Sequence, residues 1–415
     1  MALFSRKRLT LFLMVFWISI SYSQETINVM FYNLLNFPEA PPTNRSDILK
    51  VIIDNYQPDL LMVCELQSEA GANMILNTSL KTIDNRYKRT EFVYNQSSSN
   101  TDLQQLAFYN SNKLILESQN EVITDVRDIN HYTFKLNSSS ASVYIDAFVA
   151  HLKSSQGVDN EETRLQMAMD FTTYLSTIPK DHYVLLAGDF NFYTSNENGY
   201  QELIDPTNAI QLIDPLNRPG NWNNNSTFAD IHTQSTRISS VPFNDYGAGG
   251  GLDDRFDFIL LSQNLTNSTE LFYVDNSYKA YGNNGNCFNK SINDTSCTGE
   301  FSQTIRNILY NMSDHLPVIL GLQTDQVLAV DDNYHTEQMI RFTNGNIIND
   351  LLSLKLNPQL LNKNILIYNV LGQQVISKKV TDNEIKIDAT HLPNGIYYLY
   401  SSNSDFHEPI KFIKV

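Results

Sequence analysis

The sequence predicts a mixed α/β domain built of packed layers, followed by a small all-β domain at the C-terminal end. Three observations support this prediction. Short apolar runs rich in β-branched and aromatic residues alternate with helical segments over most of the chain. Beyond about residue 340, strand-like runs follow one another, separated by turn residues. Hydrophobic residues make up 42% of the 415 residues and charged residues 18%, so there is enough apolar material for a core.

The elements of the first domain can be placed from their patterns. An alternating run over 27–33 predicts a strand, and a helix capped by Ser46 is expected to end before Pro58. A second helix is expected over 161–175. Further apolar runs predict strands over 60–64, 143–152, 183–188 and 256–262. Residues 191–254 are rich in Asn, Gly, Pro and Asp, which predicts long functional loops.

The N-terminal segment has the features of a secretory signal. Three basic residues at positions 6 to 8 precede an apolar run over 9–20, and small residues follow it. The run is shorter than the roughly 18 to 20 apolar residues that a membrane span needs. We therefore expect a signal peptide over 1–23, an exported protein and no stable membrane span.

The charge balance is acidic. The chain has 29 Lys and Arg against 45 Asp and Glu, a formal net charge of −16, and removing the three positive charges of the signal leaves −19. Residues 338–415 carry eight basic and six acidic side chains, so the preceding mature segment carries −21. This charge disfavours diffuse binding to nucleic acid or anionic lipid, and a phosphate substrate would need a few aimed side chains or a divalent cation.

The same shift in charge marks a domain boundary. We expect a first domain over 24–325, a linker over 326–337 and a β-sandwich over 338–415.

Export also permits disulfides. Cys287 and Cys297 flank a stretch rich in Asn and Ser and are expected to close a surface loop, whereas Cys64 lies in an apolar run and is expected to be buried.

Polar residues of catalytic type follow the predicted strands. Each has an ordinary alternative when taken alone: an Asn or Asp after a strand is usually a turn residue, and a loop histidine usually has a structural partner. Together they would build a concave polar site at one rim of a rigid sheet. These residues are Asn33, Glu65, His151, Asp189, Asp257, Asp314 and His315.

Two of these motifs are the more specific. In the run GDFNF, Asp189 and Asn191 are two residues apart, so in an extended segment both side chains point the same way. In the run SDHLPV, Asp314 places a carboxylate beside His315, a proton carrier of near-neutral pKa. Hydrolysis of a phosphodiester needs charge neutralised on the phosphate, an aligned water and help for the leaving oxygen. A metal at Glu65, the pair of Asp189 and Asn191, and the two histidines His151 and His315 would supply these three functions.

The ordered motifs FYNLLNF, LLMVCELQ, AHLKSS, LAGDFNF, RFDFILLS and SDHLPVIL, over about residues 26–322, resemble the endonuclease/exonuclease/phosphatase superfamily. The resemblance implies a deoxyribonuclease I-like α/β fold, in which a two-layer β-sandwich is flanked by helices. It also implies a hydrolase of phosphate esters that uses a divalent metal, usually Mg²⁺, with Mn²⁺ or Ca²⁺ as alternatives.

The resemblance also implies roles for single residues. Glu65 resembles the metal carboxylate, Asn33 a ligand of the metal or the phosphate, and Asp314 a further metal ligand or second orienting acid. Leu35 is apolar where some repair-type relatives have a carboxylate, which argues against a metal site shared in that way.

Five further residues resemble the catalytic groups of the family. Asp189 corresponds to the residue that orients and activates the attacking water, and Asn191 to the amide that binds this water or the phosphate. His151 and His315 correspond to the two histidines that contact the scissile phosphate, with Asp257 supporting His315.

The C-terminal runs NILIYNVLGQQV, IDATHLPNGIYYLYSS and KFIKV resemble the type A sorting domain of the type IX secretion system of Bacteroidetes. The resemblance implies export through the periplasm to the medium or the cell surface, with the secretion machinery as a partner. The alternative is a carbohydrate-binding or adhesion sandwich, which we rank second because neither Trp17 nor Trp222 lies in this region.

Three functions remain open from the sequence. The first is a secreted nuclease, monomeric, with nucleic acid as substrate, which the loop over 214–237 would contact through Arg218, Trp222 and Arg237. The second is a phosphomonoesterase or a sphingomyelinase-like or inositol-phosphatase-like hydrolase of the same fold. The third is an inactive surface binding protein, against which the intact set of site residues argues.

Overall fold

The computed structural model describes residues 25–98, 103–138, 142–328, 340–343, 346–401 and 410–415. The chain divides into two compact units between residues 329 and 330. The expected signal peptide lies outside the described residues, as does most of the expected linker over 326–337, so both stay predictions.

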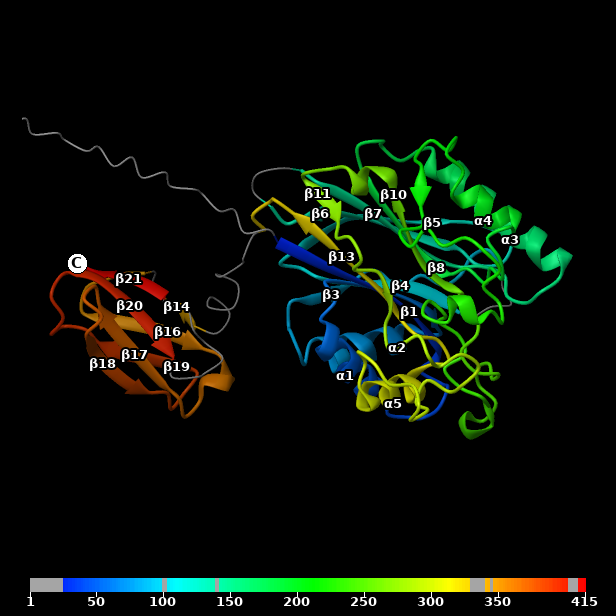
Figure 1. Ribbon diagram of the computed structural model, residues 1–415. Coiled ribbons are helices and arrows are strands. Elements are labelled where there is room, and N and C mark those ends of the chain that lie inside the picture. The colour runs from blue at the N-terminus through cyan, green and yellow to red at the C-terminus, as the bar shows by residue number, and fades with distance from the viewer. Residues whose placement is uncertain (1–24, 99–102, 139–141, 329–339, 344–345, 402–409) are drawn as a thin grey trace, which may run out of the picture. The chain divides into compact units, whose positions relative to one another are not determined.

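The first unit contains two sheets that pack face to face (Figure 1). The seven-stranded sheet has the order β11 (Leu271–Tyr273), β13 (Val318–Thr324), β1 (Glu25–Phe37), β2 (Leu60–Leu66), β4 (Gln104–Asn110) and β3 (Tyr87–Arg89), and β12 (Lys279–Ala280) also pairs with β13. The six-stranded sheet has the order β5 (Leu114–Val122), β6 (Ile129–Leu136), β7 (Tyr144–His151), β8 (Tyr183–Asp189), β10 (Asp257–Ser262) and β9 (Leu212–Ile213).

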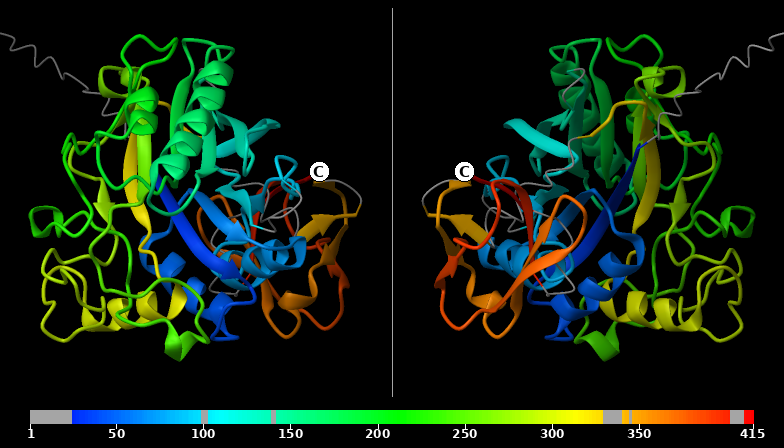
Figure 2. Two further views of the ribbon diagram at one scale, coloured as in Figure 1. Left: turned by 90° about the vertical axis from the view of Figure 1, so that its right-hand side faces the viewer. Right: turned by 90° about the vertical axis from the view of Figure 1, so that its left-hand side faces the viewer.

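Helices cover the outer faces of both sheets, as the views in Figure 2 also show. The seven-stranded sheet carries α1 (Arg45–Tyr56), α2 (Glu69–Met74), the π-helix Ile75–Leu80 and α5 (Gln303–Met312), and the six-stranded sheet carries α3 (Val158–Leu175) and α4 (Asn198–Leu203). The predicted two-layer β-sandwich flanked by helices is therefore confirmed. No helix among the described residues has the length and apolar character that a membrane crossing requires.

Alternate residues of the central strands enter different cores. Val29 and Phe31 of β1 pack between the sheets, whereas Met30 and Tyr32 pack under the helices. Strands buried on both faces appear in sequence as unbroken apolar runs, which is why these strands were predictable. Burial of each large apolar side chain stabilises the fold by about 1.5 to 3 kcal/mol. Cys64 is buried between the sheets, as predicted.

The prediction of a cap at Ser46 is wrong. The helix α1 begins at Arg45, and Ser46 is a buried residue inside it. The predicted long loops over 191–254 hold short elements as well as turns: α4, β9 and the 3₁₀ helices Ser226–Phe228 and Val241–Phe243. A further 3₁₀ helix, Gln263–Thr266, follows β10.

A disulfide joins Cys287 and Cys297, whose Cα atoms are 5.3 Å apart. Inside this closed loop the Ile292 amide donates to the Thr236 carbonyl at 2.9 Å, so the loop supports the segment around residue 236. Closing a loop of this size contributes roughly 2 to 3 kcal/mol in the chain-entropy model.

The second unit is an all-β sandwich with its own core. Its three-stranded sheet has the order β14 (Ile340–Phe342), β16 (Leu351–Leu356) and β19 (Glu384–Asp388). Its five-stranded sheet has the order β15 (Ile347–Ile348), β21 (Ile410–Lys414), β20 (Gly395–Ser401), β17 (Asn364–Asn369) and β18 (Gln374–Lys379), and a 3₁₀ helix spans Pro358–Leu360.

Candidate active site

Strand pairing brings the predicted site residues to one edge of the two packed sheets. β1 and β2 are parallel, so Asn33 and Glu65 both lie at their carboxyl ends. β7 and β8 are also parallel and place His151 directly beside Asp189, while antiparallel β10 begins with Asp257 opposite Asp189. The carboxyl ends of parallel strands lie at one edge of a sheet, which is the physical reason for this convergence.

One oxygen of Asp189 is the meeting point of the site. Asn33 Nδ2 donates to Asp189 Oδ2 at 3.0 Å, and His151 Nε2 and His315 Nε2 lie 3.6 and 3.7 Å from the same oxygen. Asn191 Nδ2 donates to the other oxygen, Oδ1, at 2.7 Å. Asn33 comes from one sheet and Asp189 from the other, so their hydrogen bond ties the two sheets together at the site.

Glu65, His151 and Asp189 form a group that could hold a cation. Each offers a ligand atom, and these atoms lie within 4.8 Å of one another. Burial raises the pKa of Asp189 to about 7, and burial followed by the charge of Asp314 raises the pKa of Glu65. A divalent cation would relieve this crowding of carboxylates, and carboxylate oxygens are the ligands that Mg²⁺ prefers. The residues present therefore fit a divalent metal.

Two predicted metal ligands are placed differently. Asn33 directs its nitrogen, not its oxygen, at the carboxylates: Nδ2 donates to Glu65 Oε1 at 2.9 Å, while Oδ1 accepts from the Leu35 amide. Asp314 lies outside the cation group, because its Oδ2 accepts hydrogen bonds from Gln234 Nε2 and the Ala248 amide. The group instead includes His151, which the sequence had suggested as a phosphate contact.

His315 is paired with Asp257 as expected. Its Nδ1 lies 2.8 Å from Asp257 Oδ2, and the imidazole is buried. Burial alone would lower the pKa of His315, but the neighbouring carboxylates, Asp257 first, outweigh it and raise the pKa well above its usual value. These carboxylates therefore favour the protonated form of His315.

His151 has the opposite character. Burial and the nearby Arg127 guanidinium hold the pKa of His151 well below its usual value, so the ring is neutral. Its Nδ1 is buried and has no hydrogen-bond partner among the described residues. The site thus favours the protonated form of one imidazole and the neutral form of the other.

Several site residues adopt a left-handed backbone. Glu65 has φ 58°, Asn191 φ 55°, and Leu35 and Asn36 each φ 45°. For residues other than glycine this conformation costs about 1 to 3 kcal/mol and is concentrated at functional sites. The surrounding hydrogen bonds, such as that from the Asn36 amide to Glu65 Oε2 at 3.0 Å, hold it in place.

Two of the three predicted nucleotide-contacting residues are buried. Trp222 is fully buried in the core under α3 and α4, and its Nε1 donates to the Arg218 carbonyl. Arg237 is fully buried against the Phe243 ring. Arg218 is partly exposed but paired with Asp230. The composition of the loop suggested exposed aromatic and cationic groups, whereas apolar contacts draw Trp222 and Arg237 inward.

Two residues at the site were missed from the sequence. Gln234 Nε2 lies 2.6 Å from His315 Nε2 and donates to Asp314 Oδ2 at 3.1 Å. Arg127 donates through Nη1 to the carbonyl groups of His151 and Leu152. A signal for Arg127 was present, because it precedes β6, whose start lies beside the end of antiparallel β7. Gln234 lies in a long loop that offers no such signal.

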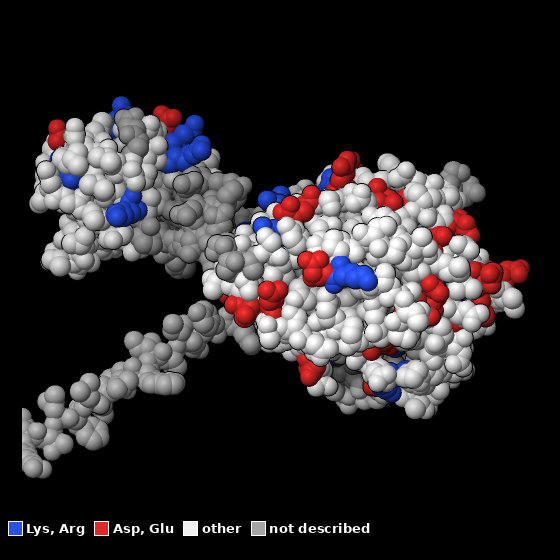
Figure 3. Space-filling view, turned by 90° about the horizontal axis from the view of Figure 1, so that it is seen from above, with Lys and Arg blue, Asp and Glu red and all other residues white. Residues whose placement is uncertain are grey.

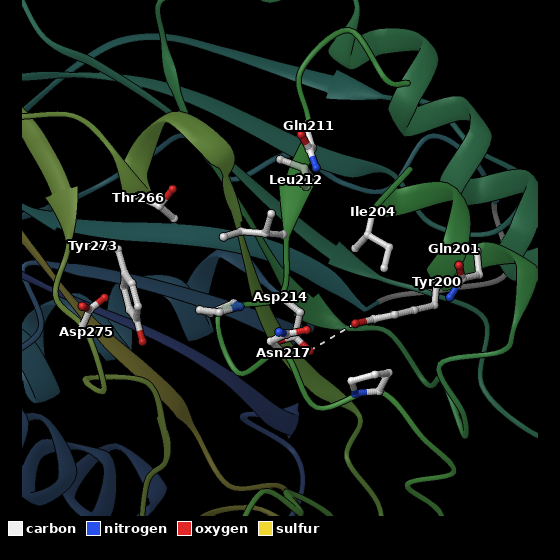
Figure 4. Close-up of a pocket in the computed structure, with 13 residues that line it drawn as sticks. Tyr200, Gln201, Ile204, Gln211, Leu212, Asp214, Asn217, Thr266, Tyr273 and Asp275 are labelled. Carbon is white, nitrogen blue, oxygen red and sulfur yellow. Dashed lines mark hydrogen bonds between the residues drawn. The ribbon is translucent and has the colours of Figure 1, made fainter. Parts of the chain in front are cut away.

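A separate cavity of about 480 Å³ lies at the edge of the six-stranded sheet (Figure 4). Asp214, one of the residues that line it, is held by two hydrogen bonds from Arg255 and one from the Tyr200 hydroxyl. None of the predicted site residues lines it.

On the face of the first unit shown in Figure 3, acidic side chains are spread widely and basic ones are few.

Residues 346–414 match the family model described as a secretion system C-terminal sorting domain. The predicted sorting domain is thereby confirmed, although the match begins later than residue 338. It indicates export, to the medium or to the cell surface. No curated protein sequence matches the chain.

Several solved structures are similar to this chain. D. rerio TDP2 complexed with a single-strand DNA product is 14% identical, with a TM-score of 0.48, and the match covers 72% of this chain and 99% of that one. The human Nocturnin catalytic domain with bound sulfate is 16% identical, with a TM-score of 0.43 and coverage of 72% and 94%. An endonuclease/exonuclease/phosphatase family protein from Bacteroides thetaiotaomicron is 13% identical, with a TM-score of 0.45 and coverage of 73% and 97%. At these scores, none of the similarities bears on the activity of this chain.

Proposed function

We propose that the chain is an exported, metal-dependent phosphodiesterase that acts on nucleic acid. The observation that carries this proposal is the convergence on Asp189 Oδ2 of Asn33 and the two imidazoles of His151 and His315, beside Glu65. Such a set can bind a phosphate, align a water and stabilise negative charge at one point.

The cation would be held by Glu65, with Asp189 and His151 close enough to share it. When bound, it would neutralise charge on the phosphate oxygens and lower the pKa of a nearby water. Asp189 accepts the proton of the attacking water, and Asn191, which donates to Asp189 Oδ1, keeps that carboxylate in place.

The remaining groups act on the phosphate itself. The protonated His315, held by Asp257, donates to an oxygen on which charge develops in the transition state. His151 is neutral and can donate one hydrogen bond without adding charge. Arg127 is anchored to the carbonyl group of His151 and adds a positive charge at the same rim.

A phosphomonoesterase of the same fold is the second candidate. It is favoured by the burial of Trp222 and Arg237, which leaves fewer exposed groups to contact flanking nucleotides. It is also consistent with the acidic charge of the chain.

The experiment is a substrate panel with the purified mature protein. Plasmid DNA, RNA, bis-p-nitrophenyl phosphate and p-nitrophenyl phosphate are incubated with Mg²⁺ and with a chelator. We expect cleavage of the diesters with Mg²⁺ only, and none by Asp189→Asn. A preference for the monoester would show that the protein is a phosphomonoesterase. If no substrate is hydrolysed, the inactive surface binding protein becomes the remaining function.

We further propose that a signal peptide over 1–23 directs the chain to the periplasm, where the type IX secretion machinery of a Bacteroidetes cell reads the sorting domain. The match of residues 346–414 to a secretion sorting family supports this route. Nothing in the proposed reaction requires a second copy of the chain, so we propose a monomer.

A further inference from the structure

Arg45 lies behind the candidate active site, at the first position of α1, and only 1% of it is exposed. Among the described residues, all the hydrogen-bond acceptors of its guanidinium are main-chain carbonyl groups. Nε and Nη2 donate to the Met312 carbonyl at 2.9 and 2.7 Å, Nη1 donates to Leu35 at 2.9 Å and Ala40 at 3.4 Å, and Nη2 also donates to Leu34. Five donors in a rigid fork can serve several acceptors at once, which a lysine ammonium cannot do in the same geometry.

These carbonyl groups belong to the two segments that carry opposite sides of the site. Leu34 and Leu35 directly follow Asn33, whereas Met312 shortly precedes His315. Ser313 makes a second link between the same segments: its Oγ donates to the Asn33 carbonyl at 2.8 Å and accepts from the His315 amide at 3.1 Å. Arg45 therefore joins two parts of the site that are far apart in sequence.

The segment that Arg45 grips is also the one with strained backbone. Leu35 and Asn36 both have φ 45°. In this conformation the Leu35 amide donates to Asn33 Oδ1 at 2.9 Å, and the Asn36 amide donates to Glu65 Oε2 at 3.0 Å. A left-handed backbone costs about 1 to 2 kcal/mol per residue. A buried leucine therefore does not adopt it without support from neighbouring groups. The hydrogen bonds that Arg45 donates to the carbonyl groups of Leu34 and Leu35 supply that support.

We propose that Arg45 is a positioning residue for the cation site. It holds the left-handed turn at Leu35 and Asn36, and through the two amides of this turn it orients Asn33 and Glu65. This inference rests on the proposed function only in that Glu65 binds the cation.

Arg45→Lys tests the proposal, because lysine keeps the charge and loses the fork. Cation affinity is measured by titration calorimetry of the mature protein with MnCl₂. Loss of a residue that orients a metal ligand weakens binding by about 10- to 100-fold, and we expect an effect of this size. With a small phosphodiester at saturating metal, we expect kcat to fall and KM to stay unchanged.

Arg306→Lys is the matched control. Arg306, on α5, is also buried and donates to main-chain carbonyl groups, those of Ile292 and Asp294 in the disulfide loop, and to Gln303 Oε1, but to none of the predicted site residues. We expect it to lower the melting temperature as much as Arg45→Lys while leaving cation affinity unchanged. Equal cation affinity in Arg45→Lys and wild type, or equal weakening in both variants, would overturn the proposal.

A second measurement separates this inference from the proposed function. Hydrogen exchange of the Leu35 and Asn36 amides is followed in cation-free protein, where Arg45→Lys is expected to accelerate it and Arg306→Lys is not. If wild type binds no cation, the proposed function fails while the exchange result still decides the role of Arg45. Unchanged exchange in Arg45→Lys would contradict that role.

Discussion

His315 shows how neighbours set the chemistry of one side chain. Burial disfavours a charged imidazole, yet Asp257 at 2.8 Å and the nearby carboxylates of Asp189 and Asp314 raise the pKa of His315 well above its usual value. The protonated ring is therefore favoured, and its Nε2 lies 3.7 Å from Asp189 Oδ2. An imidazolium that is already in place at the reacting phosphate does not have to reorganise during the reaction.

The first prediction concerns this histidine. We expect His315→Ala to lower kcat by about 10²-fold or more, since loss of one preorganised donor typically costs that much. Steady-state kinetics on a small phosphodiester at saturating Mg²⁺ measures the effect. His391→Ala, in the second unit, is the control. A rate for His315→Ala near that of wild type would exclude His315 from the reaction.

The limits of prediction at this scale have a physical cause. Asn33, Glu65, His151 and Asp189 could be placed because parallel strands end at a common edge, so order along the chain predicts proximity. No such rule applies within 191–254, where Trp222 and Gln234 lie. There, burial depends on contacts between segments that have no periodic pattern. Composition alone suggested an exposed Trp222, whereas the side chain is buried.

At the scale of elements, a largely buried polar network links β6, β7 and the residue before β8 in the six-stranded sheet. Asp146 on β7 accepts from Thr133 on β6 and lies 2.7 Å from His131 Nε2 and 2.6 Å from His182 Nδ1, just before β8. Burial alone would raise the pKa of Asp146, but hydrogen bonds from its partners outweigh it and hold the pKa below its usual value. The network therefore stabilises the ionised carboxylate.

The second prediction follows from the sign of that shift. A carboxyl with a lowered folded-state pKa contributes stability above its unfolded pKa of about 4, and this contribution is lost as the pH falls through the folded-state pKa. We expect Asp146→Asn to lower the free energy of unfolding by about 1.5 to 3 kcal/mol at pH 7. The difference in stability between the variant and wild type should shrink below about pH 4.

Tryptophan fluorescence during denaturant unfolding measures this cost. Trp222 is the only tryptophan outside the expected signal peptide, and it is buried in the first unit, so the signal reports that unit alone. Asp54→Asn, at an exposed site on α1, should change stability by less than about 0.5 kcal/mol. A cost for Asp146→Asn that does not depend on pH would refute the argument.

The strands that the sequence did not reveal are informative at the same scale. β4 is fully buried but begins with Gln104 and Gln105, and β5 has a largely exposed, polar pattern at a sheet edge. Their pairing with apolar neighbours overrides their weak intrinsic patterns. The central strands β1 and β2, in contrast, are apolar on both faces and were placed to within a few residues.

At the scale of the whole molecule, the chain is two units with separate cores. The predicted site residues all lie in the first unit, and the sorting-domain match lies in the second. The core between the sheets of the first unit extends to Leu328. Catalysis and export are therefore expected to be separable.

The third prediction is that a chain ending after Leu328 keeps its activity and loses its export. Activity is assayed with the purified truncated protein, and export is measured in the native host by fractionation of cells and medium. The cut is placed after Leu328 and not within β13, which the first unit needs for its sheet. Normal export of the truncated chain would contradict the role of the second unit.

The cation dependence of diester hydrolysis tests the central claim most directly. The rate on bis-p-nitrophenyl phosphate is measured against Mg²⁺ concentration for wild type and Glu65→Gln, which keeps the shape of the side chain and removes its charge. We predict no activity in chelator, and at least about a tenfold higher half-saturating Mg²⁺ for Glu65→Gln. Activity that persists without a divalent cation, or superimposable Mg²⁺ curves for the two proteins, would contradict a metal-dependent site at these strand ends.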